Sequence, residues 1–482
     1  MAKKAYLKKA YLRKVYFIGI AGKTMAPLAK AFKGMGWEVS GSDQKNVYPP
    51  ISTYLRENKI PYIKGYDARN VPKDANLVII GRSARMIDLD NPEYLEAKKL
   101  SCPVMSFPEA FEKYLIKENS VVVAGSFGKT TTSAIITWIL KVAGKNPSYM
   151  ISDIPINFPD GIQITNSGYS VTEGDECPAL GPCDLPKFMY YKPKYLLLTA
   201  TIWDHPEVYK SEEQYLKAFI ELVKLLPEDG ILVYELENVR PEVAEQYPSR
   251  KISYSFDSTN ADCYVKNYSI ENGKTKFTIS FKNQEIDLET ILIGKHNLQN
   301  ICGAVAMSLE LGIDSGTIKK ALKTFKGVKS RLELLGKFGG RYLFSDIAQF
   351  QEKVKGSLLA LRDFFPESRI ICVFNPFATA LKFRESLQWY STVFDSADQV
   401  IVSKVSFLKE IPKEQRVTGS DIVGAIGETQ PKVFYEPVDE KLIGYLTHQT
   451  KEGDIIVFMS SGGLRFSNLI EEITQKFQGV EV

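Results

Sequence analysis

"VVVAGSFGKTTT", residues 121–132, is the stretch that decides the fold of this chain. Its valines predict a buried strand, Gly125 and Gly128 permit a tight turn, and the threonines open a helix whose free N–H groups attract anions. Lys129 is then placed to reach terminal phosphate oxygens, and the Thr130 hydroxyl is placed to coordinate Mg²⁺. The stretch therefore predicts a phosphate-binding loop.

One position of this loop departs from the general pattern. Val123 stands where the common phosphate loop has glycine or alanine. A strand, turn and helix without any ligand is the alternative interpretation. We favour a bound nucleotide because the strand, the glycines, the lysine and the threonine all occur in order.

The composition indicates a globular protein of several domains. At 482 residues the chain is too long for one core, and about 150 residues per domain predicts three. Apolar residues make up 44% and charged residues 24%, and the net charge of +4 does not favour nucleic acid as a partner. The six cysteines form no Cys-x-x-Cys pair, so neither a disulfide framework nor a zinc site is indicated. We expect a cytoplasmic location.

The N-terminus, MAKKAYLKKAYLRK, is basic. A signal peptide or a membrane-surface helix is one interpretation, but the apolar run at residues 15–21 is short, contains glycine and lacks a cleavage signal. A solvated tail is the favoured interpretation. No apolar stretch reaches the roughly 18 residues of a membrane-spanning helix, so we expect no membrane partner.

The first part of the chain alternates predicted strands with helices. The strand patterns lie at residues 15–20, 37–43 and 75–81, and a helical pattern lies at residues 25–35. Such alternation is typical of a dinucleotide-binding fold, whose ligand lies beyond the carboxyl ends of parallel strands. The turn GIAGKTM supplies Gly19 and Gly22, and Asp43 ends the next strand, where an acidic residue usually meets a ribose. By itself, a turn with two glycines is weak evidence for a nucleotide ligand.

Two further units follow. The second has strand patterns at residues 169–174, 194–201 and 230–235. It also has an amphipathic helix at residues 215–226 and a more antiparallel part at residues 251–292. The third has buried strands at residues 369–376, 399–405 and 454–463. We therefore expect an α/β protein with an N-terminal Rossmann-like domain, a central P-loop ATPase-like domain with a parallel sheet, and a C-terminal Rossmann-like domain. Their predicted ranges are 1–118, 119–327 and 328–482.

Polar side chains that could carry chemistry follow several predicted strands. Glu173 and Asp175 can point the same way where a strand ends, and beside a triphosphate they would hold a divalent cation. A solvated strand end is the alternative for this acidic cluster, which includes Glu176. His205 follows another strand with Asp204, a position suited to metal ligation or base chemistry. Oxygen ligands with one imidazole favour Mg²⁺ or Mn²⁺ over zinc.

The chain has two other histidines. His296 precedes a helix that offers Asn300 one turn later, and the two could clamp a base or a ribose. His448 lies in a charged helical stretch, and we interpret it as a structural side chain.

Taken in order, these motifs resemble the Mur ligases, the ATP-dependent amide-forming enzymes of peptidoglycan synthesis. The markers span nearly the whole chain and read GIAGKTM, GSFGKTTT, EGDE, DH, GKHNLQN, SRLE and MSSGG. The closest resemblance is to the branch that adds L-alanyl-γ-D-glutamyl-meso-diaminopimelate to UDP-N-acetylmuramate, through GSDQKNVYPPIS, EGDECPA, KFMYYKPKYLLL and WDHPEVY. The alanine-adding branch comes next. The phosphate loop of the family resembles AGTxGKTT, so Val123 does not argue against nucleotide binding.

The resemblance implies a three-domain fold and a two-step reaction that uses ATP and Mg²⁺ or Mn²⁺. ATP phosphorylates the carboxylate of UDP-N-acetylmuramate, and the amine of an amino acid or peptide attacks the acyl phosphate. The implied catalytic residues are Lys129, Glu173 and His205, and the implied metal ligands are Thr130, Glu173 and His205. The implied ATP-binding residues are Gly125, Ser126, Phe127, Gly128, Lys129, Thr130, Thr131, His296, Asn300, Arg331 and Asp346. The implied UDP-sugar-binding residues are Gly19, Ala21, Gly22, Ser42 and Asp43.

Domain closure is also implied, because Arg331 would reach ATP through a hinge near Gly327. Some family members carry a carbamylated lysine after the histidine of DH. Lys217 lies near that region but does not align with it, so we assign it no role.

Several positions depart from the family pattern. Gln349 and Phe350 stand where the family usually has histidine with a proline soon after, and NPFATA, which includes Phe377, replaces the EPRSNT of the tripeptide branch. In addition, Phe127 replaces a frequent histidine and Ile202 a common glutamate. Because the amine substrate would be recognised near Gln349 and Phe377, we predict an ATP-using ligase with an unusual amine substrate.

Other functions stay open at this point. The chain could be the alanine-adding ligase, or a non-catalytic protein that senses cell-wall precursors through the same nucleotide pockets. A nicotinamide oxidoreductase is a third possibility, but it leaves Lys129, Glu173 and His205 unexplained. The sequence does not predict the oligomeric state.

Overall fold

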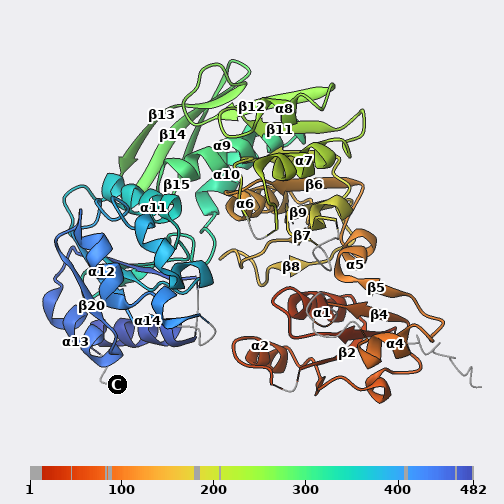
Figure 1. The fold of residues 1–482 in the computed structure, drawn as a ribbon. Helices are drawn as coiled ribbons and strands as arrows, with labels where there is room; N and C mark the ends of the chain where they lie inside the picture. Colours follow the sequence, from red (N-terminus) through yellow and green to blue (C-terminus); the bar gives the residue numbers. More distant parts are fainter. Residues whose placement is uncertain are drawn as a thin grey trace, which may run out of the picture.

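The computed structural model describes residues 13–44, 46–81, 84, 90–178, 185–205, 208–406, 411–461 and 464–479. These residues form three sheets, seen in Figure 1 as three separate parts coloured along the sequence. The basic tail, the two glycines that close MSSGG and single residues of the branch markers lie outside the described residues.

The first sheet is parallel and has the order β3-β2-β1-β4-β5. Its strands are β1 (Lys14–Ile18), β2 (Glu38–Asp43), β3 (Tyr62–Lys64), β4 (Leu77–Ile80) and β5 (Val104–Ser106). The helices between and after them are α1 (Met25–Gly34), α2 (Ile51–Glu57), α4 (Pro92–Ala97) and α5 (Phe107–Tyr114). Because β1 lies between β2 and β4, the strand order reverses at its carboxyl end, where ligands of such sheets bind.

The second sheet has ten strands in the order β15-β14-β13-β12-β11-β10-β6-β9-β7-β8. They are β6 (Asn119–Ala124), β7 (Ser148–Met150), β8 (Ile162–Gln163), β9 (Tyr169–Gly174), β10 (Tyr195–Leu198), β11 (Ile231–Glu235), β12 (Arg250–Ser255), β13 (Cys263–Glu271), β14 (Lys274–Phe281) and β15 (Gln284–Thr290). The predicted antiparallel part is antiparallel only from β13 to β15. Its first strand, β12, pairs in parallel with β11, because α8 (Pro241–Ala244) supplies the crossover between them.

Helices cover both faces of this central sheet. Val121 and Val123 of β6 belong to the same buried cluster as α6 (Lys129–Val142), α9 (Lys295–Glu310) and α10 (Ser315–Thr324). Val122 and Ala124 belong to the cluster of α7 (Glu212–Val223) on the other face. The continuous apolar run before the glycine turn therefore reflects a strand buried on both sides.

The third sheet has the order β16-β17-β21-β18-β19-β20, and only the β16–β17 pair is antiparallel. Its strands are β16 (Glu333–Phe338), β17 (Arg341–Asp346), β18 (Ile370–Phe374), β19 (Gln399–Ser403), β20 (Val433–Glu436) and β21 (Ile455–Met459). The helices α11 (Gln351–Phe364) and α12 (Gly419–Gly427) pack on one face, and α13 (Asp439–Gln449) and α14 (Leu464–Phe477) pack on the other. The predicted α/β fold with three domains is confirmed.

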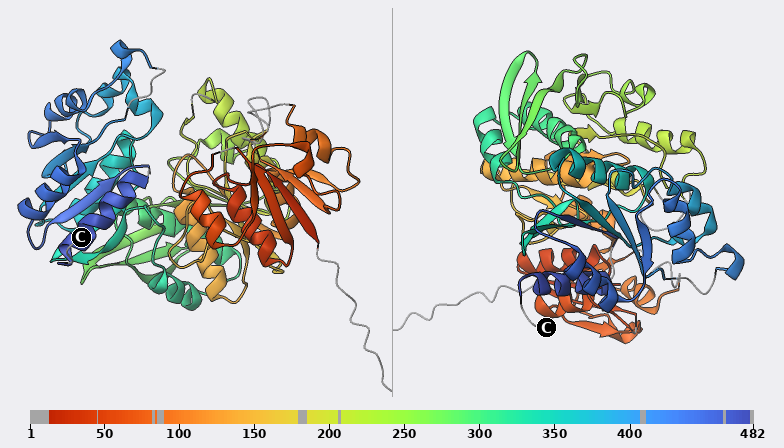
Figure 2. Two further views of the ribbon diagram at one scale, coloured as in Figure 1. Left: turned by 90° about the horizontal axis from the view of Figure 1, so that it is seen from below. Right: turned by 90° about the vertical axis from the view of Figure 1, so that its left-hand side faces the viewer.

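The first and third domains both pack against the central domain, as Figures 1 and 2 show from three directions. Asp160, just before β8, accepts a hydrogen bond from the Tyr54 hydroxyl at 2.7 Å and pairs with Lys30 Nζ at 2.6 Å. The Phe111 and Tyr191 rings form another contact between the first and central domains, with centroids 6.3 Å apart. The predicted boundaries at 118/119 and 327/328 fall between the sheets and stay predictions.

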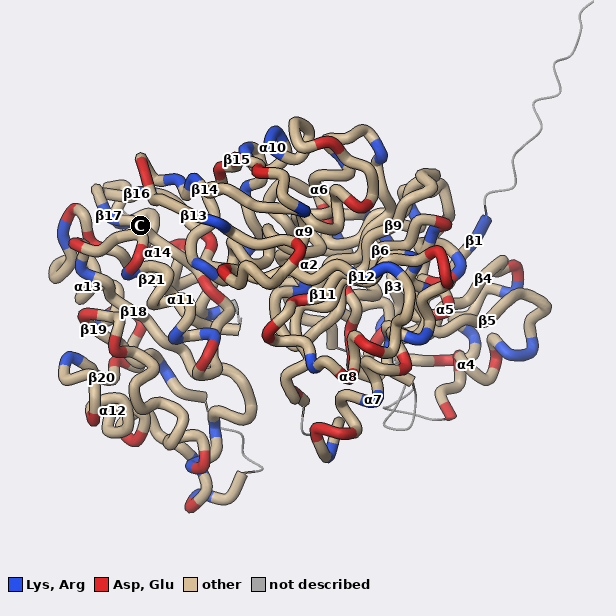
Figure 3. The backbone as a smooth tube through the Cα atoms, turned by 90° about the horizontal axis from the view of Figure 1, so that it is seen from above, with Lys and Arg blue, Asp and Glu red and all other residues tan. Residues whose placement is uncertain are grey.

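Charged side chains are mixed along all three domains. Figure 3 shows Lys and Arg interspersed with Asp and Glu along the described residues of each domain. Within the described ranges, no helix is both long enough and apolar enough to cross a membrane.

Candidate active site

The predicted phosphate loop joins β6 to α6. Gly125 and Gly128 have φ values of 137° and 80°, which other residues rarely adopt. A Cβ atom at Gly125 would lie 2.3 Å from Thr199 Oγ1, and one at Gly128 would lie 2.5 Å from Asn300 Oδ1. Gly128 is the N-cap residue of α6, and among the described residues no side chain caps this helix. The N–H groups of its first turn therefore remain available to an anion.

Lys129 opens α6 and turns back over the loop. Its Nζ donates to the Gly125 carbonyl oxygen and to both Glu176 carboxylate oxygens, at 3.1 and 3.0 Å from the latter. Burial by itself lowers the pKa of Lys129, but Glu176, Glu173 and Asp175 outweigh it, so the pKa lies above its ordinary value. The loop thus holds a charged ammonium group at neutral pH.

Glu173 and Thr130 form an oxygen pair beside the loop. Parallel pairing places Glu173 opposite Val123, so its carboxylate emerges where β6 enters the turn. The Thr130 hydroxyl donates to Glu173 Oε1 at 2.8 Å, and Ser152 N donates to Oε2 at 2.8 Å. A hydroxyl and one carboxylate fit Mg²⁺, which usually takes one or two carboxylates together with phosphate oxygens and water. The described residues contain no group of three or more His, Cys, Asp or Glu side chains that could hold a metal by itself.

Asp175 does not share the direction of Glu173, contrary to the expectation from strand alternation. Its carboxylate pairs with Lys187 and accepts a hydrogen bond from Cys177 N at 2.9 Å. The reason is that β9 ends at Gly174, so the alternation does not extend to Asp175. Glu176 is instead the second carboxylate near the loop, and the sequence offered no signal that would have selected it.

Two of the predicted polar residues lie at this loop. His205 Nε2 is 3.7 Å from Glu176 Oε1. Asn300, on α9, accepts a hydrogen bond from the Thr132 hydroxyl at 3.4 Å, one turn into α6. His296 lies apart from them, because its ring flanks Gly294 together with Ala360 of the third domain.

The remaining loop residues are held by the segment after β10. The Ser126 hydroxyl donates to the Ile202 carbonyl oxygen, and the Thr199 hydroxyl donates to the Phe127 carbonyl oxygen. Phe127 is 39% exposed, and Thr131 follows in the first turn of α6.

The predicted UDP-sugar residues gather at the carboxyl ends of β1 and β2. Gly19 N donates to the Ser42 carbonyl oxygen at 2.9 Å, and Ala21 N donates to Asp43 Oδ2 at 2.6 Å. Gly22 lies in the same turn, against Met25. The Ser42 hydroxyl is buried and donates to Glu93, so it is already used within the domain. The contacts of these residues with UDP stay predictions.

The third domain begins with strained backbone around Arg331. Ser330 and Leu332 have φ values of 54° and 48°, and such strain gathers at functional sites. The Gly327 carbonyl oxygen still accepts from Ile156 N, and Lys329 N donates to the Ile154 carbonyl oxygen at 3.1 Å. The chain is therefore bonded to the central domain up to Lys329, and the hinge near Gly327 stays a prediction.

Asp346 is buried at the end of β17. It accepts a hydrogen bond from Ala348 N at 3.1 Å and another from the Ser357 hydroxyl. Burial raises the pKa of Asp346, and the nearby Arg331 partly opposes this. Its predicted contact with ATP stays a prediction.

Asp153 connects all three domains. Arg331 Nη2 lies 2.7 Å from Asp153 Oδ2, and Lys23 Nζ, from the glycine turn of the first domain, lies 3.1 Å from Oδ1. Burial alone would raise the pKa of Asp153, but Arg331 and Lys23 prevail and lower it. The carboxylate form is therefore the one that the folded protein stabilises.

We expect Asp153→Asn to lower the free energy of unfolding at pH 7 by about 1–2 kcal/mol, because both cations are partly exposed. Since the folded pKa lies below the unfolded one, this stabilisation is present above the unfolded value and is lost as pH falls below about 4. Urea unfolding should show that the free energies of unfolding of wild type and Asp153→Asn differ less at pH 3 than at pH 7. Asp74→Asn, in an exposed pair with Lys14, is the control. A difference that is equal at both pH values would contradict the prediction.

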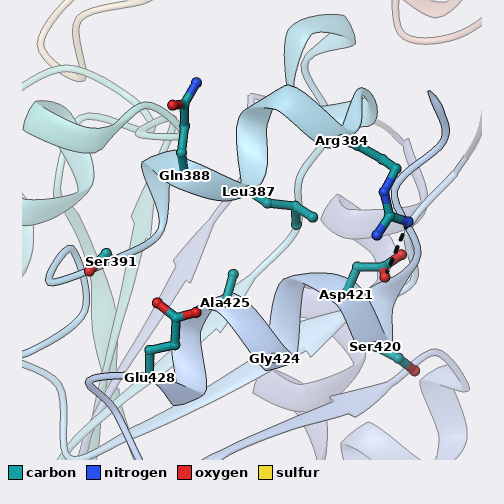
Figure 4. A pocket seen from close by; sticks show the side chains of 9 residues that line it. All are labelled: Arg384, Leu387, Gln388, Ser391, Ser420, Asp421, Gly424, Ala425 and Glu428. Carbon is teal, nitrogen blue, oxygen red and sulfur yellow. Dashed lines mark hydrogen bonds and ion pairs between the residues drawn. The ribbon is translucent and has the colours of Figure 1, made fainter.

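A surface hollow lies elsewhere in the third domain, between η4 (Arg384–Trp389) and α12 (Figure 4). Its volume is about 580 Å³, and Arg384 pairs with Asp421 across it at 3.4 Å. None of its lining residues belongs to the phosphate loop, to β9 or to the segment after β10. The candidate active site is therefore the loop and not this hollow.

Two family models match the chain. One, described as the Mur ligase middle domain, matches residues 123–308, and the other, described as the Mur ligase family catalytic domain, matches residues 14–118. The first match covers the phosphate loop, Glu173, His205 and Asn300, and the second covers the glycine turn and Asp43.

Relatives match over nearly their whole length. A UDP-N-acetylmuramate–L-alanine ligase of Brachyspira hyodysenteriae is 30% identical over 472 residues, which are 96% of this chain and 97% of the relative. A UDP-N-acetylmuramate–L-alanyl-γ-D-glutamyl-meso-2,6-diaminoheptandioate ligase of Escherichia coli is 27% identical over 449 residues, 92% and 94% of the two chains. Since both kinds of ligase match, the order of the two branches stays a prediction.

A solved structure shares the fold. The crystal structure of UDP-N-acetylmuramate-alanine ligase from Thermotoga maritima has a TM-score of 0.74 and 21% sequence identity, with 97% of this chain and 99% of that chain covered. From the relative that is 30% identical along almost the entire sequence, together with both family models, we conclude that the chain belongs to the Mur ligase family.

Proposed function

We propose that this chain is an ATP-dependent ligase that joins an amino acid or peptide to the carboxylate of UDP-N-acetylmuramate, in peptidoglycan synthesis or recycling. The observation that carries the proposal is the arrangement of Lys129, Thr130 and Glu173 around the loop at the N-terminus of α6. The relatives' names support the sugar nucleotide and the amine as substrates.

The first step transfers the γ-phosphoryl group. The bond from γ-phosphorus to the bridging oxygen of ADP breaks, and a carboxylate oxygen bonds to the phosphorus, which gives an acyl phosphate. Lys129 would neutralise charge on the phosphoryl group as it moves, and the α6 N–H groups would hold the neighbouring phosphates. Positioning and charge stabilisation account for most of the catalysis in such transfers.

The second step forms the amide. The amine nitrogen bonds to the acyl carbon, the bond to the phosphate oxygen breaks, and inorganic phosphate leaves while the nitrogen loses a proton. Thr130 and Glu173 would hold a divalent cation, which supplies further charge neutralisation when bound. We also propose His205 as the side chain that holds a second ion near the acyl phosphate.

Hydroxylamine provides the most direct test. It attacks an acyl phosphate without needing an amine-binding site, so ATP, Mg²⁺, UDP-N-acetylmuramate and hydroxylamine should give a hydroxamate together with phosphate. Coupled phosphate release and mass analysis of the product would measure both. If nucleotide and sugar nucleotide bind but no hydroxamate forms, the ligase proposal is wrong and the precursor-sensing alternative is favoured.

A further inference from the structure

Gln349 holds two loops of the third domain together. Its Nε2 donates to the Asn375 carbonyl oxygen at 3.0 Å, and its Oε1 accepts from Ala378 N at 2.7 Å. The side chain is only 3% exposed, so both polar ends are satisfied inside the protein. This bridge fixes the loop after β17, which carries Phe350, against the loop after β18, which carries Phe377.

These two rings are exposed although they belong to an ordered part of the fold. Phe350 is 41% exposed and Phe377 is 43% exposed. The Phe350 ring also packs against Trp389, with centroids 6.3 Å apart. We call Phe350, Phe377, Trp389 and the nearby Lys382 the aromatic shelf. Exposed aromatic side chains on two loops that are bonded to each other make a candidate binding surface.

Lys382 gives the shelf a charge. Its Nζ lies 5.5 Å from the centroid of the Phe377 ring, and the residue is only 8% exposed. Within the described part of the chain, its ammonium group has no hydrogen bond and no ion pair. This positive charge beside the Phe377 ring is therefore available to an anionic group that a ligand brings.

The shelf lies at the end of the third domain that faces the phosphate loop. Phe350 is the N-cap residue of α11, and Lys353 lies in the first turn of that helix. Desolvation lowers the pKa of Lys353, Asp204 and Glu176 raise it, and Lys129 contributes to the lowering. Hydrogen bonds link the loop after β17 to the active site. Ile347 N donates to the Ser330 carbonyl oxygen at 2.8 Å, and the adjacent Arg331 pairs with Asp153, which follows the Ser152 that donates to Glu173.

The central domain presents apolar side chains beside the same loop. Phe127 is 39% exposed within it, and Ile202 and Trp203 are 51% and 45% exposed in the segment after β10. The hydrogen bond from Ser126 to the Ile202 carbonyl oxygen keeps that segment against the loop. Both domains therefore offer apolar surface near the place where the acyl phosphate would form.

We propose that the aromatic shelf binds the amine substrate, and that this substrate is an amino acid with an aromatic or other large apolar side chain and a free carboxylate. Its side chain packs on Phe350, Phe377 and Trp389, and its carboxylate pairs with Lys382. The inference rests on the proposed ligase function and names the class of its amine.

The test compares acceptors on the wild-type protein that forms the hydroxamate. With ATP, Mg²⁺ and UDP-N-acetylmuramate, kcat/KM for L-phenylalanine or L-leucine should exceed that for L-alanine by at least about tenfold, which is the usual effect of extra apolar contacts. Phenethylamine, which lacks the carboxylate, should be a poorer acceptor than L-phenylalanine. A preference for L-alanine or for an acidic tripeptide would overturn the proposal.

Variants of the shelf identify the contacts. Phe377→Ala and Lys382→Met should each lower kcat/KM for L-phenylalanine about tenfold relative to the rate with hydroxylamine, and Lys382→Arg should restore part of the loss. Lys382→Met should not change the rate with phenethylamine relative to hydroxylamine, because that amine has no carboxylate to lose. Leu359→Ala, exposed on α11 outside the shelf, is the matched control.

Failure of the ligase function is distinguishable from failure of the shelf. If no hydroxamate forms, equilibrium dialysis of radiolabelled L-phenylalanine in the presence of a non-hydrolysable ATP analogue and UDP-N-acetylmuramate still tests the shelf. Binding that Phe377→Ala and Lys382→Met weaken would support the site, and no binding would overturn it.

Discussion

Lys129→Met is expected to lower kcat for hydroxamate formation by about 10³-fold or more, the scale seen when a charge-stabilising group is removed from a phosphoryl-transfer or oxyanion site. The ammonium is buried over the loop and retains its charge because the negative charges of Glu176 and Glu173, with a smaller contribution from Asp175, keep its pKa above the ordinary value. In the proposed mechanism this charge neutralises the phosphoryl group as it moves. Methionine keeps the length of the side chain but brings no charge. Steady-state phosphate release measures the effect.

Lys141→Met is the matched control, because Lys141 lies on the same helix and donates to Gln163 Oε1 at 3.0 Å, away from the loop. Thermal unfolding of both variants separates lost catalysis from lost folding, since Lys129→Met also leaves Glu176 buried without its cation. If Lys129→Met kept more than about a tenth of the wild-type kcat, the assigned role of Lys129 would be wrong.

The phosphate loop could be predicted because local sequence determines it. Gly125 and Gly128 are required by backbone conformation and by the space around them, and these requirements hold wherever a strand enters such a turn. The position of Glu173 was also predictable, because parallel pairing of adjacent strands brings their carboxyl ends to one edge. The choice between Asp175 and Glu176 was not, because it depends on the residue at which β9 ends.

Contacts between domains could not be predicted from the sequence. Asp153 lies 130 residues from Lys23 and 178 residues from Arg331, and no motif marks it. Its role depends on how the three domains pack against one another. Local sequence patterns carry no information about that packing.

The departures from the family pattern also change their meaning once they are placed in the fold. Gln349, in the place of a frequent histidine, could indicate lost catalysis when it is considered alone. In the structure it bridges Asn375 and Ala378 and so supports the surface that carries Phe377. Gln349 therefore makes specific hydrogen bonds with neighbouring residues. This favours an amine site with altered specificity over a site that has lost its function.

Glu173→Gln is expected to lower kcat by about 10²–10³-fold and to raise the Mg²⁺ concentration needed for half-maximal activity, because the amide removes the charge that would hold the cation beside Thr130. The amide oxygen can still accept from Ser152 N while the amide NH2 donates to the Thr130 hydroxyl oxygen, so the loop should keep its shape. Asp175→Asn is the matched control two residues away. Its carboxylate pairs with Lys187 instead of facing the loop, so its Mg²⁺ dependence should match wild type. Phosphate release titrated with Mg²⁺ compares the two variants, and equal shifts in both would refute the assignment of Glu173.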